Sequence, residues 1–158
     1  MSLVSDWRRF RGLAPKDGMT LIRVTVALAN ASIAIRLLPF RKVVGSAEGD
    51  ISIHEPDAAT CAREIERTRW AVEALARRLP WRIVCFQKGL ALHRLLRRRG
   101  IRTRLHYGVA PGGEGPLKAH VWVTHDGVAV IGGAEAQDYT CLATFPAASV
   151  PDARALVR

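Results

Sequence analysis

A cysteine at the start of a predicted helix constrains this chain more than any other feature. Pro80 disfavours helical backbone at Leu79, so a preceding helix should end there. After Cys85, leucines recur at helical spacing up to Gly100, a residue type that commonly ends helices. Cys85 is therefore expected in the first helical turn, where unpaired backbone N–H groups and the helix dipole favour a thiolate. The alternative is a buried structural cysteine, since a free cysteine behaves as a small apolar residue.

The composition indicates one globular domain in a reducing compartment. The 158 residues can bury a substantial core, and 49% hydrophobic with 24% charged residues are typical of a soluble protein. The three cysteines, Cys61, Cys85 and Cys141, are widely spaced and form neither a disulfide framework nor a CxxC zinc motif. We therefore expect a cytoplasmic protein that holds no metal and needs no other cofactor.

The net charge of +10 favours an acidic partner, which nucleic acid, an anionic membrane surface or an acidic peptide could each provide. The basic residues are spread over several predicted helices, and the aromatic content is only 6%. Nucleic-acid-binding surfaces usually combine basic grooves with aromatic stacking residues. We therefore do not expect nucleic acid as a partner.

The N-terminal half is predicted to be helical. Residues 1–18 should form a weakly structured basic arm without the apolar core of a secretory signal, followed by a single domain over residues 19–158. Between residues 19 and 38, Arg23 and Arg36 lie too close together to enclose the ~20 apolar residues of a membrane span. This stretch is therefore expected to be a core or docking helix. Its apolar residues at helical spacing are Ile22, Val26, Ala29, Ile33 and Leu37.

A second helix is expected over residues 58–79, with Asp57 as its N-cap. One face of this helix is apolar, and the opposite face is charged and expected to be mostly exposed. The apolar face holds Cys61, Ile65, Val72, Leu75, Ala76 and Leu79, and the charged face holds Arg63, Glu66, Arg67, Glu73 and Arg77.

After Gly100 the sequence pattern changes from helical to alternating. Strands are predicted over residues 101–109, 119–124 and 128–131, with a flexible loop over residues 111–116. The tail from Thr140 is expected to be a docking segment. Helices followed by an antiparallel sheet indicate an α+β fold.

The dipeptide Asp126-Gly127 predicts a two-residue hairpin turn. This turn would place His120 opposite Gly133 and on the same strand face as Trp122. A lone histidine on a strand is more often structural than catalytic. Together with a cysteine at a helix start, however, it is the arrangement that activates a cysteine nucleophile.

Several motifs together carry a family resemblance that extends from about Leu21 to Phe145. They are Leu37-Leu38-Pro39-Phe40, Leu79-Pro80-Trp81-Arg82 with Cys85, Ala91-Leu92-His93-Arg94-Leu95-Leu96-Arg97-Arg98-Arg99-Gly100-Ile101, Gly108-Val109, Ala119-His120-Val121-Trp122-Val123, and Asp126-Gly127 with Ile131-Gly132-Gly133. This combination resembles the lasso peptide biosynthesis B2 proteins, which are leader peptidases with a transglutaminase-like (papain-related) fold.

The resemblance implies that Cys85 is the nucleophile and His120 its general base and acid. Through an acyl-enzyme, they would hydrolyse the bond between the leader and the core of a precursor peptide. The freed core amine would pass to a separate ATP-dependent macrolactam synthetase. The chain resembles the discrete form of the family, which works with a separate leader-recognition protein.

The chain departs from this family at the third catalytic residue. The family usually supplies an Asp about where Gly132 or Gly133 stands here. Glu135 follows closely and is our candidate for the third member. Asp138, a backbone carbonyl or a water molecule are the alternatives.

Two other functions stay open at this point. The same cysteine and histidine could transfer an acyl group to an amine, since a fold does not fix the acceptor. The chain could also be a non-catalytic basic binding subunit. A basic cluster near the end of the cysteine helix could receive an acidic leader or the protein that carries it, or could merely be solvated. Its members are Lys88, Arg94, Arg97, Arg98, Arg99, Arg102 and Arg104.

Overall fold

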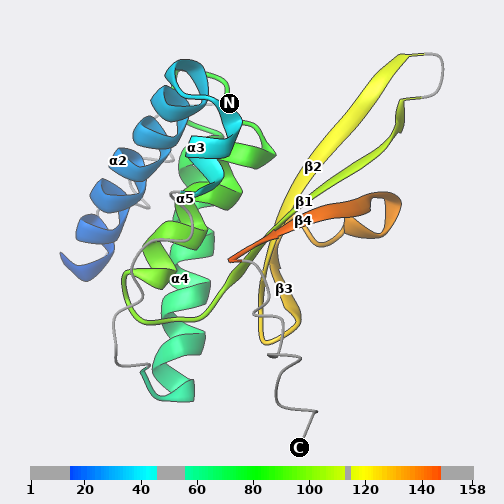
Figure 1. The fold of residues 1–158 in the computed structure, drawn as a ribbon. Coiled ribbons are helices and arrows are strands. Elements are labelled where there is room, and N and C mark those ends of the chain that lie inside the picture. The colour runs from blue at the N-terminus through cyan, green and yellow to red at the C-terminus, as the bar shows by residue number, and fades with distance from the viewer. Residues whose placement is uncertain (1–14, 46–55, 113–114, 147–158) are drawn as a thin grey trace, which may run out of the picture.

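The computed structural model describes residues 15–45, 56–112 and 115–146. In this part of the chain, helices cover one side of an antiparallel sheet (Figure 1), which confirms the predicted α+β fold. The helices are α2 (Pro15–Leu37), α3 (Phe40–Gly45), α4 (Ala58–Ala76) and α5 (Cys85–Arg97). The strands are β1 (Arg104–Gly112), β2 (Gly115–His125), β3 (Val128–Ile131) and β4 (Thr140–Phe145).

Helix α5 is the centre of the fold, because it packs against α2, α4 and the sheet. Its leucines Leu90, Leu92 and Leu96 are completely buried. Gly89 lets the helix approach β2 closely, since a Cβ atom at this position would lie 2.7 Å from Cγ1 of Val121. Gly100, at a φ of 80°, ends the helix region as the sequence predicts.

Helix α4 begins where the sequence predicts. The Asp57 carboxylate accepts a hydrogen bond from the Thr60 backbone N–H at 3.0 Å and caps the helix. The helix ends at Ala76, three residues before the predicted Leu79.

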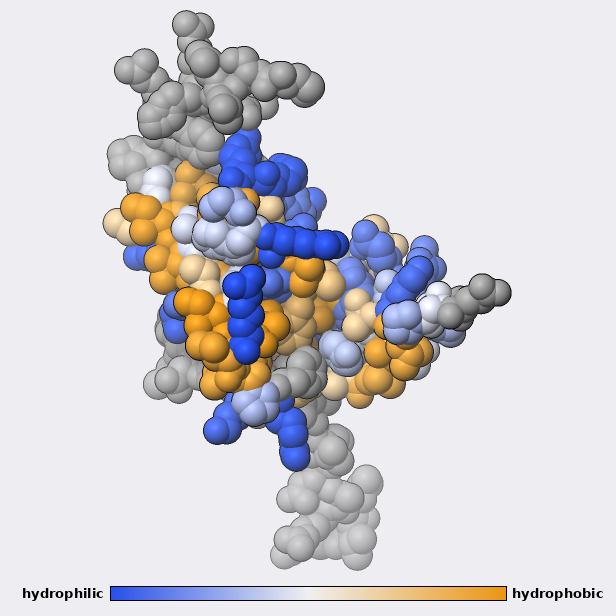
Figure 2. Space-filling model, turned by 90° about the horizontal axis from the view of Figure 1, so that it is seen from above, coloured by the Kyte–Doolittle hydropathy of each residue, from blue (hydrophilic) through white to orange (hydrophobic). Residues whose placement is uncertain are grey.

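Helix α2 buries a different stripe from the one its periodicity suggests. Val24 and Leu28 are fully buried, whereas Ile22, Val26 and Ile33 are 61%, 54% and 55% exposed. The predicted apolar stripe therefore faces outward and is not part of the core. Seen from above, hydrophobic residues lie on the surface of the helical half, interrupted by hydrophilic side chains (Figure 2).

Residues Gly18–Leu37 are long and apolar enough to cross a membrane by length and composition alone. Core helices of soluble proteins pass the same test, and α2 packs against α4 and α5. The hydropathy of this segment is therefore weak evidence for a membrane span.

The sheet has the strand order β3-β2-β1-β4. Strands β1 and β2 extend to Gly112 and from Gly115, so most of the predicted loop over residues 111–116 is strand. The tail from Thr140, predicted as a docking segment, forms β4 and pairs with β1, a strand that the sequence interpretation did not assign.

The hairpin between β2 and β3 has the predicted turn. Asp126 and Gly127 have φ values of 47° and 81°, as a tight hairpin of this type requires. An irregularity then shifts the register so that Val123 pairs with Ile131, where β3 ends. His120 therefore has no ladder partner at Gly133 and pairs with Gly108 of β1.

Candidate active site

Cys85 is the first residue of α5, as predicted. Val84 before it is the N-cap, with extended backbone, and its N–H donates to Oε1 of Gln87 at 2.8 Å. This contact holds the first turn and leaves early backbone N–H groups close to the half-buried Cys85 side chain. The sulfur therefore lies at the positive end of the helix dipole.

The His120 ring on β2 is held by a backbone group. Its Nε2 lies 2.8 Å from the carbonyl oxygen of Gly132. Because a carbonyl can only accept, Nε2–H is the donor, and Nδ1 is the basic nitrogen of the neutral ring. The ring also stacks on Trp122 and contacts Tyr139, at centroid distances of 6.1 and 5.0 Å. These contacts fix both the tautomer and the ring plane.

Gly132 occupies a position that an aspartate would not fit. Its φ is +72°, which strains any residue with a side chain. A Cβ atom would also lie 2.7 Å from the Val121 carbonyl oxygen and 3.2 Å from Nε2 of His120. The backbone carbonyl therefore accepts the hydrogen bond for which an acidic side chain was predicted at about this position.

Glu135, the predicted third member, lies next to this contact. Its Oε2 atom is 3.7 Å from Nε2 of His120, and its side chain is 63% exposed. That distance is too long for a hydrogen bond but close enough for an electrostatic contact. Glu135 is thus a neighbour of the histidine, and the Gly132 carbonyl is its hydrogen-bond partner.

Cys85 and His120 line the same cavity, which has a volume of about 620 Å³. The close approach of Gly89 to Val121 brings Cys85 and His120 to the same cavity, because Gly89 lies one helical turn after Cys85 and Val121 directly follows His120. In the described part of the chain, the thiol makes no hydrogen bond to the imidazole. Such contacts are often long in ligand-free enzymes and tighten when substrate binds.

Charged residues of α4 and α5 surround this cavity. Arg69, Arg77 and Lys88 contribute positive charge, and Glu73 joins Glu135 on the negative side. The sequence interpretation assigned Glu73 and Arg77 to a mostly exposed helix face. It missed their place in the cavity because it could not show which side of α4 meets β3. The described residues contain no group of three His, Cys, Asp or Glu side chains that could hold a metal ion.

The other described histidines on the nucleophile helix and first strand have structural contacts. His93 is buried, and its Nδ1 is 2.8 Å from the Thr103 hydroxyl. His106 bridges the hydroxyls of Thr124 and Thr144 across three strands, at 2.8 and 3.1 Å. Burial, followed by the Arg104 charge, lowers the pKa of His106. The His54 position lies outside the described residues.

The predicted basic cluster is only partly exposed. Arg97 is buried, Arg94 donates to the Val43 carbonyl at 3.3 Å, and Arg99 pairs with Glu64 at 3.3 Å. The exposed members are Arg98, Arg102 and Arg104. The seven residues therefore do not form a continuous basic face, because Arg97 is buried and Arg94 and Arg99 contact neighbouring helices.

A cysteine at a helix N-terminus and a histidine on an antiparallel strand, facing one cavity, define a cysteine-nucleophile class of site. The chain belongs to the transglutaminase-like superfamily, which it matches over residues 25–144. This match contains Cys85, His120 and Gly132, and it is compatible with peptidase and acyl-transfer chemistry. Neither the curated proteins nor the solved structures contain a significant match.

Proposed function

We propose that this protein is a cysteine peptidase that removes the leader from a lasso peptide precursor. The observation that carries the chemistry is the shared cavity of Cys85 and a His120 ring whose Nδ1 is the basic nitrogen. The motif resemblance from Leu21 to Phe145 supports the choice of substrate. Membership of the transglutaminase-like superfamily supports the reaction class.

In the proposed reaction, Nδ1 of His120 takes the Cys85 proton as substrate closes the gap between them. The thiolate attacks the carbonyl carbon of the scissile bond, and first-turn N–H groups of α5 face the developing oxyanion. The imidazolium then protonates the leaving amine as the C–N bond breaks. Water, deprotonated by His120, cleaves the resulting thioester and regenerates the thiol.

The freed amine belongs to the core peptide and would be the nucleophile of a separate ATP-dependent macrolactam synthetase. Acyl transfer is the alternative, in which an amine replaces water at the thioester. A non-catalytic binding subunit is the third possibility. Mass spectrometry of the incubated precursor distinguishes them, since the precursor would be cleaved, cross-linked or unchanged.

We further propose that a separate recognition protein delivers the leader to the surface between α2 and α5. A cavity of about 390 Å³ lies there, with Leu95 and the exposed Ile22 and Val26 among its lining residues. Arg23 and Arg98 also line it. An apolar groove with positive edges suits an acidic amphipathic helix, which favours a protein partner over a second copy of this basic chain.

Replacing the nucleophile tests the peptidase proposal. Cys85→Ala should abolish leader removal and leave the fold intact, because the substitution removes little volume. Cys141→Ala is the matched control, since Cys141 is an exposed cysteine on β4 and should be dispensable. His120→Ala should lower the rate on the order of 10² or more. Full cleavage by the Cys85→Ala variant would exclude the proposed mechanism.

A further inference from the structure

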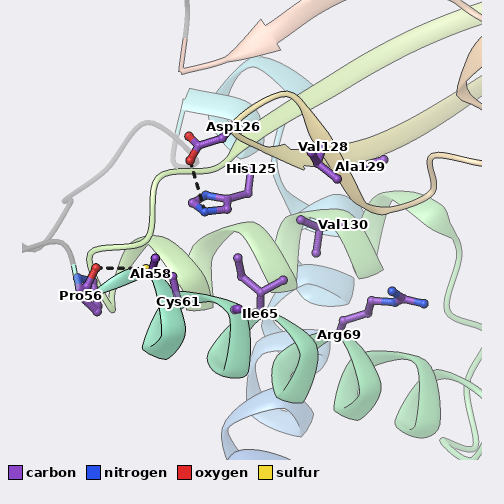
Figure 3. Close-up of a pocket in the computed structure, with 11 residues that line it drawn as sticks. Pro56, Ala58, Cys61, Ile65, Arg69, His125, Asp126, Val128, Ala129 and Val130 are labelled. Atoms are coloured by element: carbon purple, nitrogen blue, oxygen red, sulfur yellow. Dashed lines mark hydrogen bonds and ion pairs between the residues drawn. The ribbon is translucent and has the colours of Figure 1, made fainter.

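A second cavity lies between α4 and the β2–β3 hairpin, and the proposed mechanism does not use it. Its volume is about 510 Å³. Ile65 of α4 and Val130 of β3 point toward one another across it (Figure 3). Val128, at the start of β3, also lines the cavity and is 71% exposed. A large apolar side chain exposed beside a cavity indicates a surface that a ligand can cover.

This apolar cavity adjoins the one that contains Cys85. Arg69, Ala129 and Val130 line both cavities. On α4, the shared Arg69 lies four residues after Ile65 in the apolar cavity and four before Glu73 in the other. Residues four apart lie on one helix face, so the same stripe of α4 forms a wall of both. The two cavities are therefore parts of one groove.

The groove is long enough to hold an extended peptide. Its α4 wall runs from Ala58 to Arg77, which corresponds to about 28 Å at ~1.5 Å per residue. An extended chain rises ~3.3 Å per residue, so the groove spans about eight residues. The midpoints of the two parts are separated along α4 by roughly 14 Å, or about four extended residues.

The polar groups at the apolar end are already occupied. The Cys61 thiol donates to the Pro56 carbonyl at 3.3 Å. His125 donates from Nδ1 to the Arg102 carbonyl at 2.7 Å and lies 3.6 Å from the Asp126 carboxylate. What this end offers a ligand is therefore mainly apolar surface. The Cys85 end, by contrast, carries several charged side chains.

We propose that the apolar cavity is a substrate subsite for a large aliphatic side chain of the peptide that Cys85 cleaves, about four residues from the scissile bond. This inference rests on the proposed peptidase function. Continuity with the Cys85 cavity favours the substrate itself as the occupant. Because burying an aliphatic side chain is worth about 10- to 100-fold in affinity, the subsite would select among peptides.

Binding to the inactive enzyme tests the subsite without turnover. Fluorescently labelled cleavage-site peptides, each with leucine or aspartate at one of the five positions on either side of the bond, are titrated with Cys85→Ala protein. We expect one position, three to five residues from the bond, at which leucine binds about 10-fold tighter than aspartate or better. Equal affinity of both peptides at every position would overturn the inference.

A substitution that places a positive charge beside the cavity provides the second measurement. Val128→Lys in the Cys85→Ala background should abolish the leucine preference and favour the aspartate peptide. Leu142→Lys is the matched control, because Leu142 is 61% exposed on the opposite edge strand and should leave both affinities unchanged. An unaltered preference in Val128→Lys would contradict the subsite. If the leucine peptide bound more tightly but the wild-type protein cleaved neither peptide, the peptidase function would be rejected and the binding site would be retained.

Discussion

Gly132 supplies to His120 the hydrogen-bond acceptor that the motif resemblance assigns to an aspartate. The acceptor for Nε2 is a main-chain carbonyl at 2.8 Å, presented by a residue with positive φ. The sequence was sufficient to identify Cys85 and His120 as candidates and to show that an aspartate was missing. It could not identify the group that replaces the aspartate. Every residue carries a backbone carbonyl, and the left-handed turn that presents the one at Gly132 depends on where β3 ends.

The contrast between Gly132 and Glu135 predicts different effects on catalysis. Gly132→Ala should lower kcat about 10²-fold, because the strained backbone and the new Cβ atom displace the carbonyl from His120. Glu135→Gln should lower kcat less than about fivefold, since exposed ion pairs contribute little. Steady-state kinetics should show the loss in kcat with little change in KM, a pattern that a partly unfolded preparation would also give.

Circular dichroism melting separates a positioning effect from loss of fold at Gly132. If Glu135→Gln proved as damaging as His120→Ala, the carboxylate, not the carbonyl, would be the third member of the site.

At the scale of elements, the sequence predicted the start of α5, the Asp57 cap and the hairpin turn. Each depends on local signals, namely Pro80 and the leucine spacing after Cys85, Asp57 as a helix cap, and Asp126-Gly127 as a turn. The outward stripe of α2 and the strand β4 were not predicted, because each depends on which distant element packs alongside.

The close approach of α5 to β2 predicts that Gly89 controls the geometry of the site. A methyl group there would meet Val121 at 2.7 Å and Leu105 at 3.2 Å. Gly89→Ala should therefore push the helix from the strand and destabilise the protein by about 1–3 kcal/mol. Because Cys85 lies one turn away, kcat should fall as well. Chemical denaturation and peptide-cleavage kinetics measure the two effects.

Gly18→Ala is the matched control for this substitution. Gly18 is also a helical glycine, but a Cβ atom there has nothing within 4 Å. Its replacement should stabilise the protein by about 0.5–1 kcal/mol and leave kcat unchanged. Equal effects of the two substitutions would show that helix propensity, not the contact with β2, explains the result at Gly89.

At the scale of the whole molecule, composition predicted an acidic partner but not where it binds. The basic residues that give the net charge of +10 are spread along the whole sequence and do not mark one surface. Arg97, which the sequence placed in an exposed cluster, is only 4% exposed. Solvent exposure of one arginine among several depends on how α5 packs between its neighbours, which the helical pattern alone does not specify. Among the exposed members of the cluster, Arg98 lines the groove between α2 and α5, and this supports our proposal that the partner docks there.

Reversing one charge at this groove tests the proposed delivery of the leader. Arg98→Glu should raise the KM for precursor in the presence of the recognition protein by about 3- to 10-fold, with little change in kcat, because exposed charges mainly steer association. Between about 50 and 200 mM NaCl, the wild-type KM should rise as salt screens the attraction, and the variant should respond less. Arg63→Glu is the control, since it makes the same change in net charge at an exposed position on α4. If Arg63→Glu and Arg98→Glu raised KM equally, the partner would be sensing the overall charge of the protein and not the α2–α5 groove.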